Sequence, residues 1–231
     1  MTKKVSPKTS GGVRRGERLT NCSRDRCGRR YNAFTLIELI VVVSIIAVLS
    51  ALVLSTAGYA RKKGARARAE TEIAAMSAAI ENYKSDNGIY PRGPANAITI
   101  GTVTIPANAT DNLNARTRGD PADTADPTYG ETSLYLYTLL SGDTDGDRSP
   151  NSNVKSYMAF KPNMLLPSGG SGPVTAISDP FGNSYGYSTA NQADPVTPKG
   201  YNPTFDLWST TGLTTAGQPT QADQNQWIKN W

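Results

Sequence analysis

Histidine is absent from this 231-residue chain, and its only two cysteines, Cys22 and Cys27, lie within the first 33 residues. Without histidine, and without cysteine after residue 33, the usual nucleophile–base pairs of hydrolases cannot form there. The chain also lacks a glycine-rich phosphate-binding loop of the P-loop type. We find no catalytic constellation, and we expect a protein that is not an enzyme and requires no cofactor for chemistry.

The scarcity of cysteine also limits how the chain can be held together. From Phe34 onward no disulfide is possible, so the fold must depend on packing, sheet pairing or a metal. The Cys22–Cys27 pair alone is poor evidence for zinc in a chain without histidine. We interpret these two residues as incidental thiols.

Charge is almost missing between Arg30 and Arg61, where Glu38 is the single exception. The charge-free run from Leu39 to Ala60 contains 22 residues. As a helix it would be roughly 33 Å long, enough to cross the hydrocarbon core of a bilayer. A carboxylate at the edge of such a span is costly in hydrocarbon, so Glu38 is expected to have a partner or a task.

Basic residues concentrate in front of this span. Residues 1–33 contain ten basic and two acidic residues, a net charge of +8, which leaves −3 for the rest of a chain whose net charge is +5. A basic excess can indicate nucleic-acid binding, but beside a membrane span the positive-inside rule keeps it cytoplasmic. We therefore predict no nucleic-acid partner. Residues 1–30 are polar and are expected to be a disordered leader.

The junction of leader and span carries a specific motif. Residues 33–43, which read AFTLIELIVVV, resemble the class III signal of type IV pilins and of the pseudopilins of type II secretion. That family has a basic leader, a small residue before the cut, and then Phe-Thr-Leu-Ile-Glu-Leu. Ala33 stands here where the family usually has glycine.

The resemblance implies roles for three residues. A prepilin peptidase would cut between Ala33 and Phe34 and would methylate the new amine of Phe34. Glu38 would pair with the N-terminal amine of a neighbouring subunit and set the register of assembly. The pairing requires leader removal, because the amine does not exist before the cut.

Other interpretations of the apolar run remain open. A cleaved secretory signal has a shorter apolar core that precedes its cleavage site, whereas the candidate cut here precedes a long run. A plain signal anchor explains the hydrophobicity and the basic flank but gives no reason for Glu38. In that case Glu38 would simply extend to the headgroup region.

Beyond the span the sequence is alanine-rich and amphipathic. Apolar residues at spacings of three and four form one helical stripe, which is expected to pack against a soluble domain: Ala65, Ala69, Ile73, Met76, Ile80 and Tyr83. Nearby charged residues, including Glu72, fall mostly off this stripe. Gly88 and Pro91 should end the helix, with Tyr90 packing back on it, in a turn that also resembles the family. One helix is therefore predicted from Phe34 to about Asn87.

The remaining sequence predicts a short helix and a small antiparallel sheet. Residues 98–105 alternate like a strand or hairpin arm, and the rest of 92–130 is predicted to be a long variable loop. Residues 133–140 should form a short helix packed on the long one. The later strand candidates are 154–160, 184–187 and 205–208.

The predicted fold class is α+β: a long N-terminal helix, membrane-spanning in its first half, whose second half packs on the sheet. The predicted parts are a cleaved leader at 1–33, a transmembrane and assembly helix at 34–60, an amphipathic helix and turn at 61–91, and a globular head at 92–231.

Three segments of the head extend the resemblance to the major pseudopilin of type II secretion. Residues 179–187, DPFGNSYGY, look like its Asp-Pro-Trp-Gly-Asn-Pro-Tyr-x-Tyr hairpin. Residues 205–209, FDLWS, resemble its Tyr-Asp-Leu-x-Ser strand, and residues 228–231, IKNW, resemble its Ile-x-Asn-Trp ending. Residues 92–175 match the family poorly.

Calcium is the one ion for which the sequence offers candidates. The family's head often holds Ca²⁺ in a loop after the Asp-Leu-x-Ser strand, but here that loop supplies one carboxylate, Asp223. A second cluster has the Asp-x-Asp-x-Asp start of a calcium loop: Asp143, Asp145 and Asp147. It is not an EF-hand, because Arg148 and Val154 replace the usual glycine and bidentate glutamate. A solvated turn is the alternative for this cluster.

With the resemblance, the sequence indicates a structural subunit of a pilin-like filament, a pseudopilin of type II protein secretion. The implied location is the bacterial inner membrane, with the leader cytoplasmic and the head periplasmic. The implied partners are further copies of the chain, minor pseudopilins, the prepilin peptidase, an inner-membrane assembly platform and the lipid bilayer. Three alternatives stay open: a type IV pilus subunit for adhesion, motility or DNA uptake, a sensor or enzyme domain on a signal anchor, and a binding module that uses the 92–130 loop.

Overall fold

The computed structural model describes residues 34–125, 127–197, 199–215 and 217–231. The predicted leader, with its expected disorder, its two cysteines and Ala33, lies outside the described residues. Internal contacts divide the chain into two units, one ending at Ser50 and the other running from Ala51 to Trp231. The folded head belongs entirely to the second unit.

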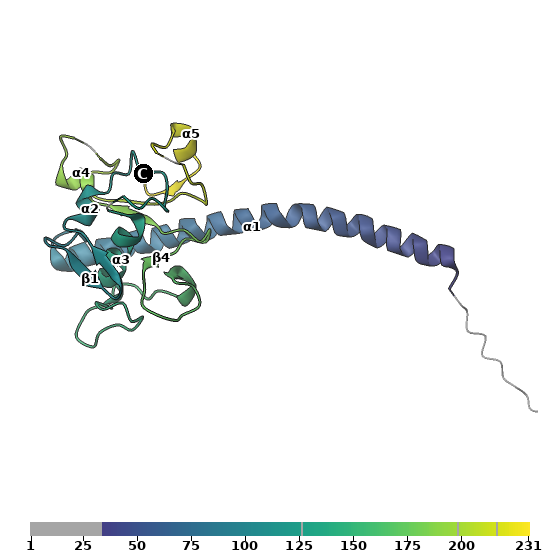
Figure 1. Ribbon diagram of the computed structural model, residues 1–231, viewed down its shortest axis with the longest axis horizontal. Helices are drawn as coiled ribbons and strands as arrows, with labels where there is room; N and C mark the ends of the chain where they lie inside the picture. Colours follow the sequence, from purple (N-terminus) through teal and green to yellow (C-terminus); the bar gives the residue numbers. More distant parts are fainter. Residues whose placement is uncertain (1–33, 126, 198, 216) are drawn as a thin grey trace, which may run out of the picture. The chain divides into compact units, whose positions relative to one another are not determined.

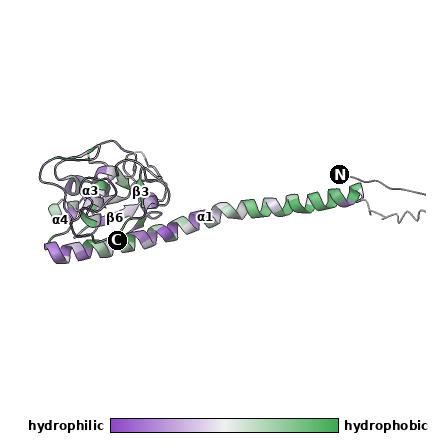
Figure 2. Ribbon diagram, turned by 90° about the horizontal axis from the view of Figure 1, so that it is seen from below, coloured by the Kyte–Doolittle hydropathy of each residue, from purple (hydrophilic) through white to green (hydrophobic). Residues whose placement is uncertain are grey.

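The long helix α1 spans Leu36–Asn87, so the predicted helix is confirmed, with its start two residues later than expected. Gly88 follows the helix with φ of 77°, and its amide donates to the Lys84 carbonyl at 2.7 Å. This is the left-handed cap that the glycine was expected to supply. Figure 2 shows the hydrophobic colour along the N-terminal half of α1 and a mixture of hydrophilic and hydrophobic colours along the C-terminal half.

The C-terminal half of α1 carries the apolar stripe that the spacing predicted. Its central members are buried in the main core of the head: Ala69, Ile73, Met76 and Ile80. Tyr90 is also buried, and its hydroxyl donates to Glu81 of α1 at 3.2 Å, so the predicted return of this ring to the helix is confirmed. The expectation for Glu72 was wrong, because its side chain lies on the buried side of the helix.

Helix α3, Tyr129–Ser141, contains the predicted short helix at 133–140. It begins with a capping box, in which the Glu131 amide donates to the Thr128 hydroxyl at 3.1 Å and the Thr128 amide donates to the Glu131 carboxylate at 2.7 Å. It ends at Gly142, which has φ of 79°. Three of its four leucines belong to the same hydrophobic cluster as the stripe of α1, in agreement with the predicted packing: Leu134, Leu136 and Leu140.

The strands form small antiparallel sheets beside the C-terminal half of α1 (Figure 1). The first is the hairpin β1, Ile98–Ile100, and β2, Val103–Ile105, which confirms the prediction for 98–105. The second pairs β3, Leu165–Leu166, with β4, Ala176–Ile177. The third has the order β5-β6-β7, with bounds Gly186–Ser188, Asp206–Ser209 and Ile228–Lys229.

Two predictions about the head need correction. Residues 154–160 form no strand, because the amides of Tyr157 and Met158 both donate to the Leu140 carbonyl, at 2.7 and 3.0 Å, and hold the segment across the end of α3. The 92–130 segment is more than a loop around a hairpin. It contains the short helix α2, Ala109–Asn112, and buries Leu113. The remaining short helices are η1, Pro162–Met164, α4, Ala190–Ala193, and α5, Gln221–Gln224.

Candidate functional site

Glu38 lies in the first turn of α1 and folds back onto the start of the helix. One carboxylate oxygen, Oε2, accepts hydrogen bonds from the Thr35 amide and from the Thr35 hydroxyl, both at 2.8 Å. In return, the Glu38 amide donates to the Thr35 hydroxyl at 3.3 Å. This reciprocal arrangement is a capping box, with Thr35 as the N-cap and Glu38 three residues later. The Thr-x-x-Glu pattern inside the motif therefore starts the helix as well as carrying the charge.

The position of Glu38 brings its carboxylate close to the predicted cut. The amide that it binds belongs to Thr35, one residue after Phe34. Cleavage after Ala33 would convert the Phe34 nitrogen into a cation one residue from that amide. The same carboxylate is thus placed to attract an ammonium group at the end of its own chain or of a neighbouring one. The cut, the methylation of Phe34 and the pairing of Glu38 stay predictions.

Around Glu38 the surface of the first unit is apolar. Phe34 is 83% exposed, and the large side chains that follow it along α1 are also exposed. Phe34, Ile37 and Val41 border Glu38 in a shallow groove of about 300 Å³. By length and composition, α1 passes the criteria for a membrane-crossing helix. An exposed apolar helix of this kind needs lipid or the same helix in other subunits to cover it.

The acidic cluster at 143–147 is a hydrogen-bonded turn. Carboxylate oxygens of Asp143, Asp145 and Asp147 lie within 4.8 Å of one another, with Asp143 buried and the other two exposed. Asp143 accepts from the amides of Gly146 and Arg148 at 2.7 and 2.8 Å. It also accepts from the Tyr137 hydroxyl at 2.7 Å.

This geometry limits how the cluster could hold calcium. Donors already bind both carboxylate oxygens of Asp143, so an ion would have to displace them or rely on Asp145 and Asp147. Two exposed carboxylates supply only some of the six to eight oxygen ligands that calcium prefers. Hydrogen bonding with Asp143, partial loss of hydration and the nearby charge of Asp147 raise the pKa of Asp145. Calcium binding here stays a prediction.

Asp223, the other calcium candidate, caps helix α5. Its Oδ2 accepts from the Thr220 hydroxyl at 2.7 Å and from the Thr220 amide at 2.9 Å. These bonds lower the pKa of the Asp223 carboxyl. They give Asp223 a local structural role that requires no ion, and calcium there also stays a prediction.

Sequence reasoning missed a buried carboxylate on α1. Glu72 is 8% exposed, and its two oxygens have separate partners. The Arg68 guanidinium donates to Oε1 at 2.6 Å, and the buried Tyr185 hydroxyl donates to Oε2 at 2.8 Å. Burial, followed by the charge of Glu72, raises the pKa of Tyr185. The i, i+4 spacing of Arg68 and Glu72 was the only available signal, because Tyr185 lies 113 residues away.

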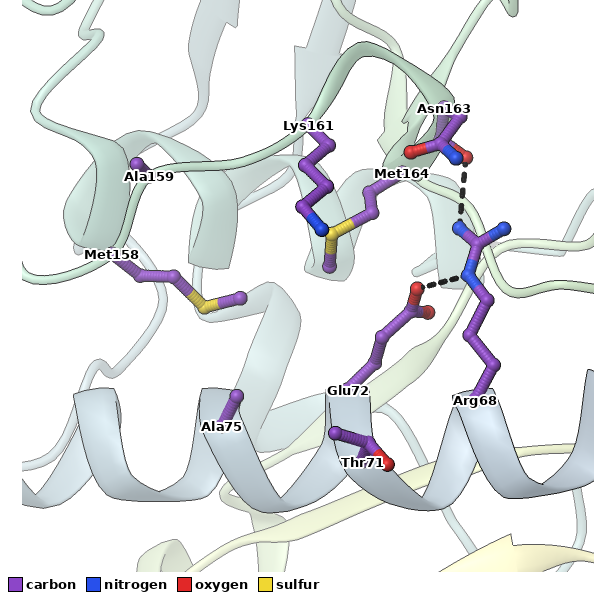
Figure 3. Close-up of a pocket in the computed structure, with 9 residues that line it drawn as sticks. All are labelled: Arg68, Thr71, Glu72, Ala75, Met158, Ala159, Lys161, Asn163 and Met164. Atoms are coloured by element: carbon purple, nitrogen blue, oxygen red, sulfur yellow. Dashed lines mark hydrogen bonds and ion pairs between the residues drawn. The ribbon is translucent and has the colours of Figure 1, made fainter.

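This ion pair borders a cavity of about 420 Å³ on the side of α1. Figure 3 shows Glu72 and Arg68 rising from the helix, with Asn163 beyond Arg68 and with Lys161 and Met164 above the pair. Arg68 also donates to the Asn163 carbonyl at 3.3 Å. Its contacts are therefore mainly structural, since they join α1 to the segment that leads into β3.

Two of the head motifs that resemble the pseudopilin contain a buried aspartate, Asp179 or Asp206, and each of these aspartates stabilises a turn by accepting from nearby backbone amides. Asp179 accepts from the amides of Phe181 and Asn183, both at 2.9 Å, and from the Ser209 hydroxyl at 2.6 Å. Asp206 accepts from the amides of Tyr201 and Asn202 at 2.8 and 2.9 Å. Burial raises the pKa of both carboxyls, and these hydrogen bonds oppose the rise.

Comparison with known proteins finds the same family resemblance as the motif at residues 33–43. Residues 28–54 match the family described as the prokaryotic N-terminal methylation motif, and this range includes the predicted cut and Glu38. The type II secretion system core protein G of Pectobacterium carotovorum is 36% identical over 69 residues, which are 30% of this chain and 44% of that protein. The chain thus spans less than half the length of this relative.

Two further relatives extend the comparison. The type II secretion system core protein G of Escherichia coli is 29% identical over 140 residues, covering 57% of this chain and 94% of that protein. The major component of the type IV wide pilus of Thermus thermophilus is 38% identical over 85 residues, 36% of this chain and 63% of that protein. No solved structure matches the chain significantly. These matches confirm the resemblance to pilin-like proteins that the sequence predicted.

Proposed function

We propose that this chain is a pseudopilin of a type II protein secretion system, a structural subunit that joins a pilin-like filament after its leader is removed. One observation carries the proposal: a single carboxylate, Glu38, stands in the first turn of a long exposed apolar helix, directly beside the predicted cut. The similarity to core protein G of Escherichia coli, which extends over 94% of that protein, supports the same function.

In this proposal the chain enters the inner membrane with its basic leader in the cytoplasm and its head in the periplasm. The charge of +8 on residues 1–33 supports this orientation through the positive-inside rule. A prepilin peptidase then cuts between Ala33 and Phe34 and methylates the amine of Phe34. Methylation leaves the nitrogen cationic, so the charge required for assembly is preserved.

Assembly follows from the new charge. The ammonium of one subunit approaches Glu38 of a neighbour, where the low dielectric strengthens their attraction and desolvation offsets part of it. The apolar residues around Glu38 provide the packing surface between the helices. The filament contains further copies of the chain and minor pseudopilins, and an inner-membrane platform assembles it. Before assembly, the lipid bilayer covers the helix.

A pair of substitutions at Glu38 tests this mechanism. Glu38→Gln keeps the size of the side chain and an oxygen that can accept from Thr35, but it removes the charge. Glu38→Ala removes both. If charge pairing drives assembly, both variants insert into the membrane and neither forms filaments. Filaments formed by Glu38→Gln would show that the capping box is the only role of Glu38 and would overturn the proposal.

A matched control and a chemical measurement complete the test. Glu70→Ala removes an exposed carboxylate of α1 beyond the span and should leave assembly unchanged. Mass spectrometry of the native protein should find a methylated Phe34 at the N-terminus. A native protein that keeps its first 33 residues would favour a signal anchor instead.

A type IV pilus subunit is the second candidate function. The similarity to a wide-pilus component of Thermus thermophilus, over 63% of that protein, favours it. Both candidates share the cut, the methylation and the role of Glu38, so they differ only in the filament. Long surface pili that disappear in a deletion strain would support the pilus. Loss of protein secretion without loss of pili would support the pseudopilin.

A further inference from the structure

A second basic segment follows the apolar span at once. Arg61, Lys62, Lys63 and Arg66 all precede Glu70, which is the first acidic residue after the span. Among the described residues none of these four cations forms a salt bridge with a carboxylate. Four cations without a carboxylate partner at the outer end of a membrane span run against the usual positive-inside bias, and an anionic partner would compensate their charge.

Two of these cations line a cleft between α1 and the head. Lys62 and Arg66 are four residues apart, so they lie on the same face of the helix. The cleft has a volume of about 220 Å³, and its other walls are Phe181, Thr211, Leu213 and Gln226. No carboxylate is among these lining residues.

The cleft is held in shape from both sides. Arg66 donates from Nη1 to the Gln226 carbonyl at 2.8 Å, which fixes its guanidinium while leaving its other donors available. The Thr211 hydroxyl donates to the same carbonyl at 3.2 Å. Phe181 and Leu213 are half-buried and supply an apolar wall opposite the two cations. The site thus combines fixed positive charge with an apolar wall.

Its depth agrees with the headgroup layer of a bilayer. The apolar run ends at Ala60, so Lys62 and Arg66 stand roughly 3 and 9 Å beyond it along the helix axis. A headgroup layer is about 5–8 Å thick, so the two residues bracket the phosphate level. Tyr59, which is 72% exposed just before this level, is the kind of residue that favours the membrane interface.

We propose that this cleft binds the phosphate of an anionic phospholipid, with Lys62 and Arg66 contacting the phosphate and with Phe181 and Leu213 contacting the glycerol and the start of an acyl chain. The lipid would hold the head at a fixed depth and rotation on the membrane surface before assembly. The proposal needs only the span in a bilayer, so it stands or falls independently of filament formation.

The test uses the full chain reconstituted as single copies in lipid nanodiscs. Tryptophan fluorescence reports the melting of the head in discs of phosphatidylglycerol and in discs of phosphatidylcholine. A lipid that binds the folded head stabilises it. Two cations near an anionic surface should raise the melting temperature by about 4–8 °C in phosphatidylglycerol relative to phosphatidylcholine. The basic leader is the same in every variant, so it adds the same background to each comparison.

Matched variants separate the cleft from general charge. Lys62→Gln with Arg66→Gln should abolish the difference between the two lipids. Lys161→Gln with Lys199→Gln, which removes equal charge elsewhere on the head, should leave it intact. Lys62→Gln alone should roughly halve the difference. Because Lys62 is exposed, this variant keeps the proposal testable if loss of the Arg66 contact unfolds the head.

Three results would overturn the proposal. The double variant at Lys62 and Arg66 could keep the full lipid-dependent shift. Inorganic phosphate at 10 mM in phosphatidylcholine discs could reproduce the shift, which would assign the cleft to a free anion. Finally, the shift could appear only in discs that hold two copies, which would make the cleft a contact between subunits.

Discussion

Tyr185 donates its hydroxyl proton to Glu72 at 2.8 Å, across 113 residues of sequence, and so joins the segment before β5 to the long helix α1. Tyr185 is fully buried, and Glu72 is nearly so. Arg68 binds the other oxygen of the carboxylate at 2.6 Å. A buried charge held by two donors is stable only while both remain, because the loss of either leaves the carboxylate incompletely compensated.

Tyr185→Phe is therefore expected to destabilise the head. It removes a hydrogen bond to a charged group without changing the shape of the ring, which should lower the free energy of unfolding by about 1.5–3 kcal/mol. Urea unfolding of the full chain in micelles, followed by tryptophan fluorescence, measures the change. Tyr157→Phe is the matched control, because the hydroxyl of Tyr157 bonds exposed partners, Asn87 at 3.0 Å and the carboxylate of Asp86, rather than a buried charge. Equal losses in the two variants would contradict the importance of the buried bond.

Acidification should stabilise the head through Asp179. Burial raises the pKa of this carboxyl in the folded protein above the ordinary value of 3.8. Its contribution is therefore fully present below pH 3.8 and is lost as the pH rises through the folded-state pKa. Asp179→Asn should flatten this part of the stability profile, as measured by melting temperature against pH.

Asp194→Asn provides a comparison in which the pKa shift, and so the pH dependence of stability, has the opposite sign. Hydrogen bonds from Thr197 lower the pKa of the exposed Asp194, so its contribution is present above pH 3.8 and is lost as the pH falls through the lowered value. Removing it should reduce stability at neutral pH rather than at acidic pH. Identical profiles for the two variants would show that burial of Asp179 does not control the pH response.

Gly186 is expected to tolerate no side chain. It pairs with Trp208 between β5 and β6, and a Cβ at this position would collide with the Trp208 ring. Gly186→Ala should therefore cost about 1–3 kcal/mol of unfolding free energy. Gly64→Ala is the control: nothing lies within 4 Å of a Cβ there, and the exposed helical site should gain ~0.5–1 kcal/mol. Urea titration of both variants measures the contrast, and a neutral Gly186→Ala would show that the ring moves aside freely.

The sequence predicted those parts of the fold whose signals are local. The apolar spacing of α1, its glycine cap at Gly88 and the alternation at 98–105 each depend on neighbours within a few residues, and each was confirmed. The family motif that singled out Glu38 is also a local signal, because it is a short run of consecutive residues. The capping box of Glu38 with Thr35 likewise involves residues only three positions apart.

The predictions that failed depended on distant partners. Glu72 carries a charge that local rules assign to the surface, yet Tyr185 binds it inside the head. Residues 154–160 have the composition of a strand, but two of their amides donate to the Leu140 carbonyl instead of to a neighbouring strand. Leu113 is buried in a cluster with Trp208 and Trp227, about 95 residues or more further along the chain, and Ser188 donates to its carbonyl at 2.6 Å from 75 residues away. None of these partners can be identified from a single sequence.

The capping box at the start of α1 can be separated from the charge of Glu38 through Thr35. Its hydroxyl donates to Glu38 Oε2 and accepts from the Glu38 amide, so Thr35→Ala removes both bonds. Loss of an N-cap costs about 1 kcal/mol, which corresponds to roughly fivefold faster hydrogen exchange of the Glu38 amide. Exchange measured by mass spectrometry on the full uncut chain in micelles tests this. Thr35→Ser keeps the hydroxyl and should exchange at the wild-type rate. Equal exchange in the alanine and serine variants would mean that the membrane environment, and not the Thr35 hydroxyl, holds the first turn of the helix.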